Sequence, residues 1–173
     1  MMSANIQLDH SDHRPARRAL PLCYLAHDLD SPANVGSLFR IADALGVEKI
    51  HLTGRSPLPP NSKLRKTSRA AEKYVPYSHA ADPVPVLREL RADGYRVISL
   101  ELTSASIDVR QLAVAASDRI CLVLGSENAG VNQVLLDLSE QAVHIPMIGH
   151  NSSMNVATAC AIATFAIGSA LAG

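Results

Sequence analysis

The amino-acid sequence predicts an α/β fold in which a mostly parallel sheet is flanked by helices. Three short apolar runs, at residues 22–26, 47–52 and 119–124, are bounded by Gly, Pro or polar turn residues and are typical of buried strands. A helical pattern separates the first two runs, and the order strand, helix, strand indicates a parallel pair. The chain has 173 residues, 47% of them hydrophobic, so we expect one domain with a sizeable core.

The polar segment at residues 1–19 shows no hydrophobic periodicity. We interpret it as a tail, and its Arg14, Arg17 and Arg18 are candidates to touch a polyanion. The folded domain is therefore expected to span residues 20–173.

The first unit of the domain is expected to run from residue 22 to residue 52. A strand at residues 22–26 is followed by a turn rich in Asp and Pro, which leads into a helix from about residue 34 to residue 45. Gly46 closes this helix, and the strand at residues 47–52 follows directly.

The remaining elements repeat the alternation. Residues 53–62 contain Gly and three Pro residues, and they are expected to form a loop that leads into a basic segment. The elements expected after it are a short strand near residues 74–77, a helix at 85–92, a strand at 96–102, a short helix at 111–115, a strand at 119–124, a helix at 131–138 and a strand at 142–145.

The C-terminal stretch predicts a long helix over residues 156–172. It is rich in Ala, Val and Ile, contains no Gly or Pro before Gly168, and follows Ser152 and Ser153, either of which is placed to cap it. Polar Thr and Ser residues interrupt the apolar run, so a buried or subunit-interface helix is favoured over a membrane span. We therefore expect a homodimer whose interface includes this helix, and no membrane association.

The formal net charge of zero hides an asymmetry along the chain. Residues 1–80 contain 11 Lys and Arg against 7 Asp and Glu, whereas residues 81–173 contain 5 against 9. Lys63, Arg65, Lys66 and Arg69 are close together, which indicates a patch that contacts phosphates; a solvated surface loop is the alternative.

Composition excludes several functional classes. The three cysteines, Cys23, Cys121 and Cys160, fall in expected strands and a helix rather than at disulfide or metal-binding spacings, which indicates reduced thiols in a cytoplasmic protein. The seven His residues are scattered, so no metal site is predicted. Only 3% of residues are aromatic, so base stacking is not expected to carry nucleic-acid recognition.

Three polar loops follow expected strands, at the edge where open parallel sheets bind their ligands. The first contains Asn34-x-Gly36-x-x-x-Arg40, in which Gly36 permits a close backbone approach and Arg40 lies one helical turn further on, towards the loop. An ordinary surface ion pair between Arg40 and Asp43 is the alternative for this arginine. The other two loops are residues 125–130 and 145–155.

Common phosphate-binding and hydrolase motifs do not match these loops. No Gly-Lys-Ser/Thr follows the second loop, and it lacks the first Gly-x-Gly of a dinucleotide fingerprint. The surroundings of Ser126 also lack the Gly-x-Ser-x-Gly pattern of a serine hydrolase.

Taken in order, the three motifs resemble the SpoU/TrmH-type branch of the SPOUT class of RNA methyltransferases. They are Asn34-x-Gly36-x-x-x-Arg40, then Leu124-Gly125-x-Glu127-x-x-Gly130, then Ile145-Pro146-Met147 with Ser153-Met154-Asn155-Val156. The resemblance covers about residues 20–170. One segment departs from it, because the family usually has Gly before the Ala-Glu pair at residues 71–72, and we place that departure at Ala71.

The resemblance implies both a fold and a chemistry. The fold would be a sheet whose C-terminal segment is threaded into a deep trefoil knot, the SPOUT fold, in a homodimer. The chemistry would be transfer of a methyl group from S-adenosyl-L-methionine to a ribose 2′-hydroxyl of tRNA or rRNA. The residues implied to act on the RNA are Arg40, Asn34, Glu127, Ser153 and Asn155, and those implied to bind the cofactor are Leu102, Gly125, Ile145, Met147, Ser153 and Met154.

The role of Arg40 remains open between two alternatives. The corresponding arginine of the family is thought to accept the proton, but a guanidinium with a pKa above about 12 is a poor base. Arg40 is equally suited to hold the adjacent phosphate and to stabilise the developing alkoxide.

Two other functional classes are consistent with parts of the sequence. A catalytically silent RNA-binding protein of the same fold would not need Arg40, Glu127 and Asn155. A small-molecule nucleotide enzyme with an ordinary open sheet would not need the basic segment.

Overall fold

A parallel sheet forms the centre of the fold. The computed structural model describes residues 5–9, 11–12 and 18–173, and within these the sheet has seven strands in the order β3-β2-β1-β6-β4-β7-β5, all paired in parallel. The strands are β1 (Leu20–His27), β2 (Val47–Thr53), β3 (Tyr77–Ala80), β4 (Tyr95–Leu100), β5 (Ile107–Asp108), β6 (Arg119–Leu124) and β7 (Gln141–His144). The predicted fold class, a mostly parallel sheet flanked by helices, is confirmed.

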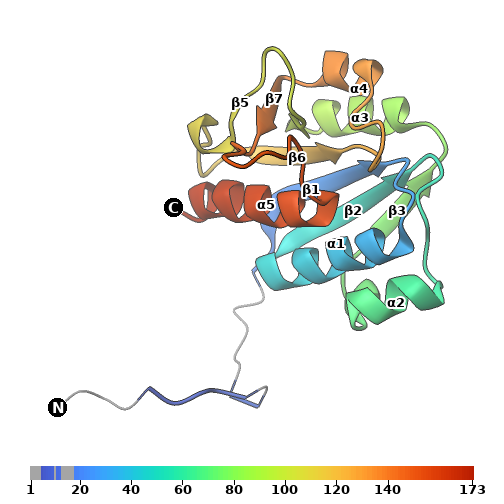
Figure 1. Cartoon of the computed structure of the whole chain (residues 1–173), viewed down its shortest axis with the longest axis vertical. Helices are drawn as coiled ribbons and strands as arrows, with labels where there is room; N and C mark the ends of the chain where they lie inside the picture. The colour runs from blue at the N-terminus through green and yellow to red at the C-terminus, as the bar shows by residue number, and fades with distance from the viewer. Residues whose placement is uncertain (1–4, 10, 13–17) are drawn as a thin grey trace.

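Helices cover both faces of this sheet (Figure 1). They are α1 (Pro32–Leu45), α2 (Ser62–Ser68), α3 (Pro83–Ala92), α4 (Gln133–Leu138) and α5 (Val156–Ala172), with 3-10 turns at Ala71–Lys73 and Val109–Gln111. Helices α1 and α5 pack on one face and α3 and α4 on the other, while α2 packs on the outer side of α1.

The alternation of side chains along β1 explains the two layers of the core. Leu22, Tyr24 and Ala26 belong to the core cluster shared with α1 and α5, whereas Cys23 and Leu25 belong to the cluster shared with α3 and α4. Both sets are buried, because successive side chains of a strand point to opposite faces and each face of this strand is covered by helices.

Several predicted boundaries were wrong, and local hydrogen bonds explain them. The expected strand at 74–77 begins only at Tyr77, because the preceding residues form the helical turn Ala71–Lys73. The basic segment, for which no element was predicted, contains α2, which Asn61 caps by accepting from the backbone N–H groups of Lys63 and Leu64. The short helix expected at 111–115 is instead the turn Val109–Gln111.

Smaller differences concern the ends of strands and helices. Strand β4 ends at Leu100 rather than at residue 102, and β7 ends at His144 rather than at residue 145. Helix α4 begins after the cap Asn132, two residues later than expected, and the two-residue strand β5 was not predicted.

Asn155, rather than Ser152 or Ser153, caps the C-terminal helix. Its side-chain oxygen accepts hydrogen bonds from the backbone N–H groups of Ala157 at 2.9 Å and Thr158 at 3.2 Å. The helix itself, predicted over residues 156–172, is confirmed with these bounds.

Gly36 permits a close contact between α1 and α2. A β-carbon at Gly36 would lie 2.1 Å from the hydroxyl oxygen of Thr67 and 2.2 Å from the carbonyl oxygen of Leu64. The Thr67 hydroxyl also donates to the carbonyl of Ala33 at 2.9 Å. The close approach predicted at Gly36 is therefore made by the basic helix α2.

Ala70 has an unusual backbone conformation, next to the departure predicted at Ala71. Its φ of 73° lies in the left-handed region that favours glycine, whereas Ala71 begins the helical turn and is buried. The departure from the family pattern itself stays a prediction.

The division between a tail at 1–19 and a domain at 20–173 stays a prediction. Strand β1 begins at Leu20, whose N–H donates to the carbonyl of Gly46 at 2.7 Å. Arg14 and Arg17 lie outside the described residues, and the trefoil knot likewise stays a prediction. Among the helices of the described residues, none has the length and apolarity to cross a membrane.

His51 makes the stability of the fold dependent on pH. Burial, together with the charge of Lys49, lowers the pKa of His51 from 6.5 to about 4. The unfolded chain therefore takes up a proton as the pH falls through about 6.5, whereas the folded chain does so only near pH 4. The free energy of unfolding should fall by about 2 kcal/mol over this window through His51 alone, after allowance for partial solvation.

Denaturant unfolding of wild type and His51→Gln at several pH values between 7 and 4.5 measures this contribution. Glutamine keeps a partner for Ser78, which lies 3.0 Å from the histidine nitrogen, but does not titrate. The variant should lose less stability on acidification, and parallel pH curves would show that His51 does not contribute.

Candidate functional site

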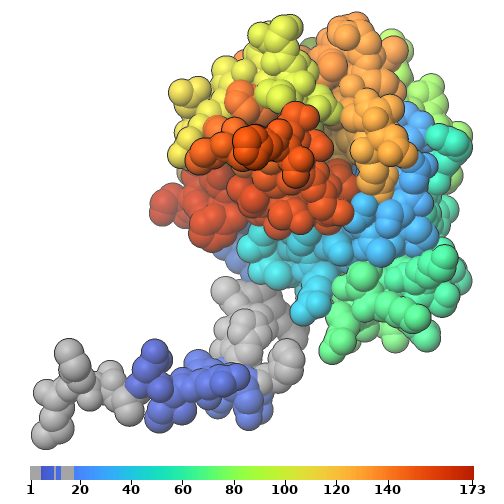
Figure 2. Space-filling model, viewed as in Figure 1, coloured from blue at the N-terminus to red at the C-terminus, as the bar shows by residue number. Residues whose placement is uncertain are grey.

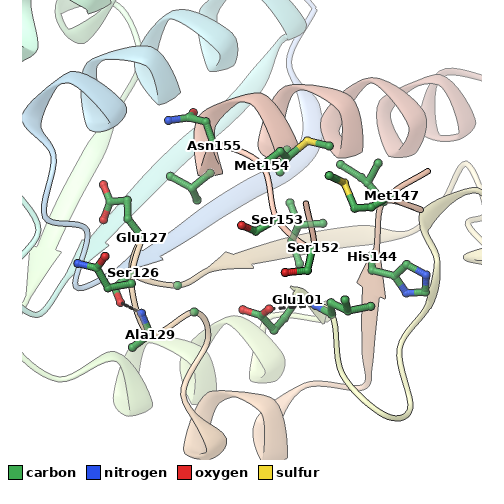
Figure 3. Close-up of a pocket in the computed structure, with 18 residues that line it drawn as sticks. Glu101, Ser126, Glu127, Ala129, His144, Met147, Ser152, Ser153, Met154 and Asn155 are labelled. Carbon is green, nitrogen blue, oxygen red and sulfur yellow. Dashed lines mark hydrogen bonds between the residues drawn. The ribbon is translucent and has the colours of Figure 1, made fainter. Parts of the chain in front are cut away.

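A cleft lies at the carboxyl ends of the neighbouring strands β6, β4 and β7 (Figure 3). Its volume is about 470 Å³, which is within the range of roughly 300–1,000 Å³ for small-molecule sites. It is lined by the segments 100–102, 125–130, 144–147 and 152–156, with Ala159. The cleft is thus formed by the loops after three adjacent parallel strands, where α/β sheets usually bind ligands.

Hydrogen bonds connect the three predicted motifs beside this cleft. The Glu127 carboxylate accepts from the side-chain amide of Asn34 at 2.7 Å, and Asn155 donates from its side-chain amide to the Asn34 oxygen at 2.9 Å. These residues are 93 and 121 positions apart in sequence from Asn34. The fold therefore brings together three of the five residues that were predicted to act on the RNA.

Glu127 also closes the start of α1. Its carboxylate accepts from the backbone N–H groups of Asp30 at 2.8 Å and Ser31 at 3.0 Å. Burial raises the pKa of Glu127, but these N–H groups and the Asn34 amide outweigh it and hold the pKa below its usual value. Glu127 is consequently ionised at neutral pH and serves as a hydrogen-bond acceptor.

Ser153, the fourth residue predicted to act on the RNA, lines the cleft itself. Figure 3 shows Ser152 and Ser153 directed towards the middle of the cleft, with Glu101 across from them. Met147 and His144 lie at the end of the cleft away from Glu127. Leu102, Gly125, Ile145, Met147, Ser153 and Met154, the residues predicted to bind the cofactor, all line the cleft.

The motif implies that Gly125 binds the cofactor, but the structure shows that a glycine is needed there for a contact within the protein. A β-carbon there would lie 2.0 Å from the carbonyl carbon of Gly130 and 2.2 Å from the backbone nitrogen of Val131. The absence of a side chain therefore allows the loop at 125–131 to close on itself, where Ser126 and Gly130 pair through two backbone hydrogen bonds.

Sequence reasoning missed Glu101. Its carboxylate accepts from the backbone N–H groups of Leu102 at 3.0 Å and Val131 at 2.9 Å, and so joins the loops after β4 and β6. An acidic residue directly after an apolar strand was the available signal. Glu101 and Glu127 are the charged residues that line the cleft, and Lys and Arg do not contribute to its lining.

Arg40 does not line the cleft. It lines a second hollow of about 570 Å³ between α1 and α2, with Lys66, Arg69 and the α5 residue Ala161. Within the described residues Arg40 forms no ion pair with Asp43, so the alternative interpretation is wrong, whereas the action of Arg40 on the RNA stays a prediction.

The four basic residues predicted to contact RNA are exposed on or beside α2. Lys66 and Arg69 face the hollow that contains Arg40, and Arg65 faces a third hollow on the other side of the helix. Lys63 lines neither. Groups of three or more His, Cys, Asp or Glu able to hold a metal do not occur in the described part of the chain.

Known proteins share this architecture and sequence. The model of the SpoU rRNA methylase family matches residues 21–165. A Staphylococcus haemolyticus protein assigned to the TrmH family of tRNA/rRNA methyltransferases is 28% identical over 151 residues, which are 87% of this chain and 59% of the relative. The chain therefore spans about 60% of the length of the curated relatives that it matches.

Two solved structures with bound S-adenosylmethionine are similar. The SpoU methyltransferase AviRb of Streptomyces viridochromogenes, in complex with this cofactor, has a TM-score of 0.79 and 27% identity, covering 92% of this chain and 64% of its own. A cofactor-bound rRNA methyltransferase of Sinorhizobium meliloti has a TM-score of 0.79 and 26% identity, covering 90% and 60%.

Proposed function

The chain belongs to the SpoU rRNA methylase family, and from this premise we propose that it transfers a methyl group from S-adenosyl-L-methionine to a ribose 2′-hydroxyl of tRNA or rRNA. The observation that carries the proposal is the hydrogen-bonded chain Glu127–Asn34–Asn155 at the edge of the cleft. Three segments far apart in sequence meet there, at the cleft that is lined by all six residues predicted to bind the cofactor, and this supports methyl transfer over RNA binding alone.

The residues of the cleft fit the cofactor. Ile145, Met147 and Leu102 provide apolar surface for an adenine ring, and Met147 and Leu102 are exposed as they would be around an open ligand site. The two lining carboxylates and the lack of lining Lys or Arg suit a positively charged sulfonium. When bound, S-adenosylmethionine supplies the activated methyl group.

The remaining chemistry belongs to residues of this chain. The ribose oxygen gains a bond to the methyl carbon as the sulfur–carbon bond breaks, and the hydroxyl proton passes to solvent water. Glu127 holds Asn34, Asn34 holds Asn155, and both amides lie beside the cleft, where they can orient the ribose. Arg40 holds the adjacent phosphate and stabilises the developing negative charge on the oxygen.

We infer that Arg40 acts from a second copy of the chain, because it does not line the cleft of its own chain. Helix α5 begins at the cleft with Asn155, and two turns later Ala161 lines the hollow that contains Arg40. The same helix exposes Ile162 and Phe165, which are 41% and 67% accessible. We propose a homodimer packed through this face of α5, in which Arg40 of the partner subunit completes each site.

Phe165→Glu should convert the dimer to a monomer. A charge buried at the centre of an apolar interface strongly weakens association of the two chains. Phe165 is exposed in the single chain, so the substitution should leave its fold intact. Val134→Glu on α4 is the matched control, because Val134 is also exposed and apolar but lies away from α5. Light scattering should show dimers for wild type and control and monomers for Phe165→Glu. A wild-type monomer would contradict the proposal.

Methylation mapping tests the proposed activity. Total tRNA and rRNA from cells that lack the protein would be incubated with it and labelled S-adenosylmethionine, and 2′-O-methylated nucleotides identified by nuclease digestion and mass spectrometry. Label at a single ribose 2′-oxygen is expected. RNA binding without label in either RNA class would instead indicate a catalytically silent RNA-binding protein.

Two further properties follow from the proposal. An RNA substrate and three free, buried cysteines are consistent with a reducing, cytoplasmic location. Lys63, Arg65, Lys66 and Arg69 would supply affinity for RNA phosphates without reading the bases.

A further inference from the structure

A third hollow, of about 470 Å³, lies on the side of α2 that faces away from α1. Its lining comes from the loop before α2, from α2 itself, from the turn after it and from the start of β3. These residues are Pro59, Pro60, Asn61, Ser62, Leu64, Arg65, Glu72, Lys73 and Tyr77. It shares no lining residue with the cofactor cleft or with the hollow that contains Arg40. In Figure 2 the α2 segment, in green, projects at the margin of the molecule, away from the orange and red loops of the cleft.

Tyr77 provides a fixed aromatic surface in this hollow. Its ring packs edge to face against the buried Phe39, with centroids 5.5 Å apart and an interplanar angle of 88°. Packing of this kind holds the ring in place, yet 40% of Tyr77 remains accessible. A ring that is held on one edge and open elsewhere is suited to stacking with a flat ligand.

The distribution of tyrosines supports a role in binding. Of the four tyrosines of the chain, Tyr24 and Tyr95 are buried, whereas Tyr74 and Tyr77 are exposed and lie three residues apart. The two exposed tyrosines therefore lie in the segment that directly follows the basic helix. Exposed aromatic rings beside cations are the usual components of surfaces that bind single-stranded nucleic acids.

The charges around the hollow favour an anionic ligand. Arg65 and Lys73 line it and are exposed. Glu72 is the one acidic residue of the lining, and its carboxylate accepts a hydrogen bond from the Ser68 hydroxyl. Ser68 is the buried last residue of α2, so this bond directs the Glu72 carboxylate towards the helix. Two exposed cations and one hydrogen-bonded anion leave the hollow with a net positive charge.

We propose that this hollow binds an unpaired nucleotide of the RNA substrate, separate from the nucleotide that is methylated. The base stacks on Tyr77, and its phosphate is held by Arg65 and Lys73. The inference rests on the proposed function only in taking RNA as the ligand. It differs from the expectation that base stacking does not carry recognition, because two exposed tyrosines lie beside the basic helix.

Two variants at position 77 test the stacking contact. Tyr77→Ala removes the ring, and Tyr77→Phe keeps the ring and its contact with Phe39. Binding would be measured with a fluorescent single-stranded RNA oligonucleotide and with a fully double-stranded RNA of the same length. Tyr77→Ala should weaken single-strand binding by roughly 10-fold and Tyr77→Phe by less than twofold, because base stacking does not need the hydroxyl. Double-strand binding should be unchanged in both variants.

Arg65→Ala tests the phosphate contact. It should reduce the slope of log K against log salt for the single-stranded RNA by roughly 0.7, the value for one phosphate contact. Ser62→Ala is the control, since Ser62 lines the same hollow without carrying charge. An unchanged slope would remove Arg65 from the proposed site.

A photo-crosslink on the wild-type protein tests whether RNA binds beside Tyr77, even if Tyr77→Ala folds poorly. RNA containing 4-thiouridine should crosslink to a peptide that includes Tyr74 or Tyr77, and mass spectrometry identifies it. Crosslinks confined to other segments, or equal RNA affinity of a folded Tyr77→Ala, would overturn the proposal.

The outcomes separate this site from the proposed activity. Methyl transfer with a KM for the RNA that does not depend on Tyr77 would sustain the activity and refute the nucleotide site. RNA binding that depends on Tyr77, without any methyl transfer, would sustain the nucleotide site and refute the activity. In an active enzyme, Tyr77→Ala should raise KM for the RNA and leave kcat within about twofold, because the hollow lies apart from the reacting atoms.

Discussion

Arg40→Ala should reduce the rate of methyl transfer by at least roughly 100-fold and leave the affinity for S-adenosylmethionine within about twofold. The rate loss is the usual consequence of removing a general base or a donor to a developing oxyanion. Cofactor affinity should persist because Arg40 does not line the cleft of its own chain. Single-turnover rates at saturating RNA and cofactor, with calorimetry for cofactor binding, are the required measurements.

Arg40→Lys separates charge stabilisation by this residue from positioning of the phosphate and ribose. Lysine keeps the positive charge but lacks the planar guanidinium that binds a phosphate through two hydrogen bonds. Partial recovery of the rate would favour simple charge stabilisation, whereas activity as low as that of Arg40→Ala would favour positioning of phosphate and ribose. Wild-type activity of Arg40→Ala would exclude both roles.

Mixed dimers test whether Arg40 acts across the interface. In a dimer of one Arg40→Ala chain and one Asn155→Ala chain, one site would contain both defects and the other would contain neither. Mixing the two inactive variants should therefore restore about half of the wild-type activity per mixed dimer. No recovery despite subunit exchange would place Arg40 and Asn155 in the same chain's site.

Gly125→Ala should weaken cofactor binding at least roughly 100-fold. The added carbon would lie 2.0 Å from the backbone of Gly130, so the loop must open and the lining of the cleft must move. The free energy of unfolding should also fall, by roughly 1–3 kcal/mol. Calorimetry with S-adenosylmethionine and denaturant unfolding give the two values.

Gly149→Ala is the matched control for this change. Gly149 belongs to the loop between Met147 and Ser152, and a β-carbon there meets no atom within 4 Å. The affinity of Gly149→Ala for S-adenosylmethionine and its free energy of unfolding should stay close to those of wild type. Normal cofactor affinity of Gly125→Ala would mean that the cofactor does not depend on the loop at 125–130.

Much of the fold could be predicted because the buried strands carry continuous apolar runs. The runs at 22–26, 47–52 and 119–124 lie in strands of the central sheet, and their hydrophobic pattern specifies both their length and their burial. Elements whose conformation depends on a single cap were missed or misplaced. Helix α2 starts where Asn61 binds two backbone N–H groups, a contact that leaves no periodic signal in seven residues.

The site could be predicted in part for a related reason. Residues that share a motif and follow a strand, such as Glu127 and Asn155, are brought to one edge by the parallel sheet. The place of Arg40 outside the cleft could not be predicted, because its spacing from Gly36 fixes its position along α1 but not its relation to the cleft. Glu101 was missed because its only signal was an acidic residue after a strand, and the backbone N–H groups that it binds add no further mark in the sequence.

The hydrogen bond between Asn155 and Asn34 has a consequence for the order of events during folding. It joins residues 121 positions apart, and the bond between Glu127 and Asn34 spans 93. Contacts of such long range form late, because the intervening chain must first lose its freedom. A nascent chain on the ribosome can thus complete β1, α1 and β2 while its methyl-donor cleft does not yet exist. Catalytic competence would then arise in one step, when α5 docks, so that partly made chains cannot consume the cofactor.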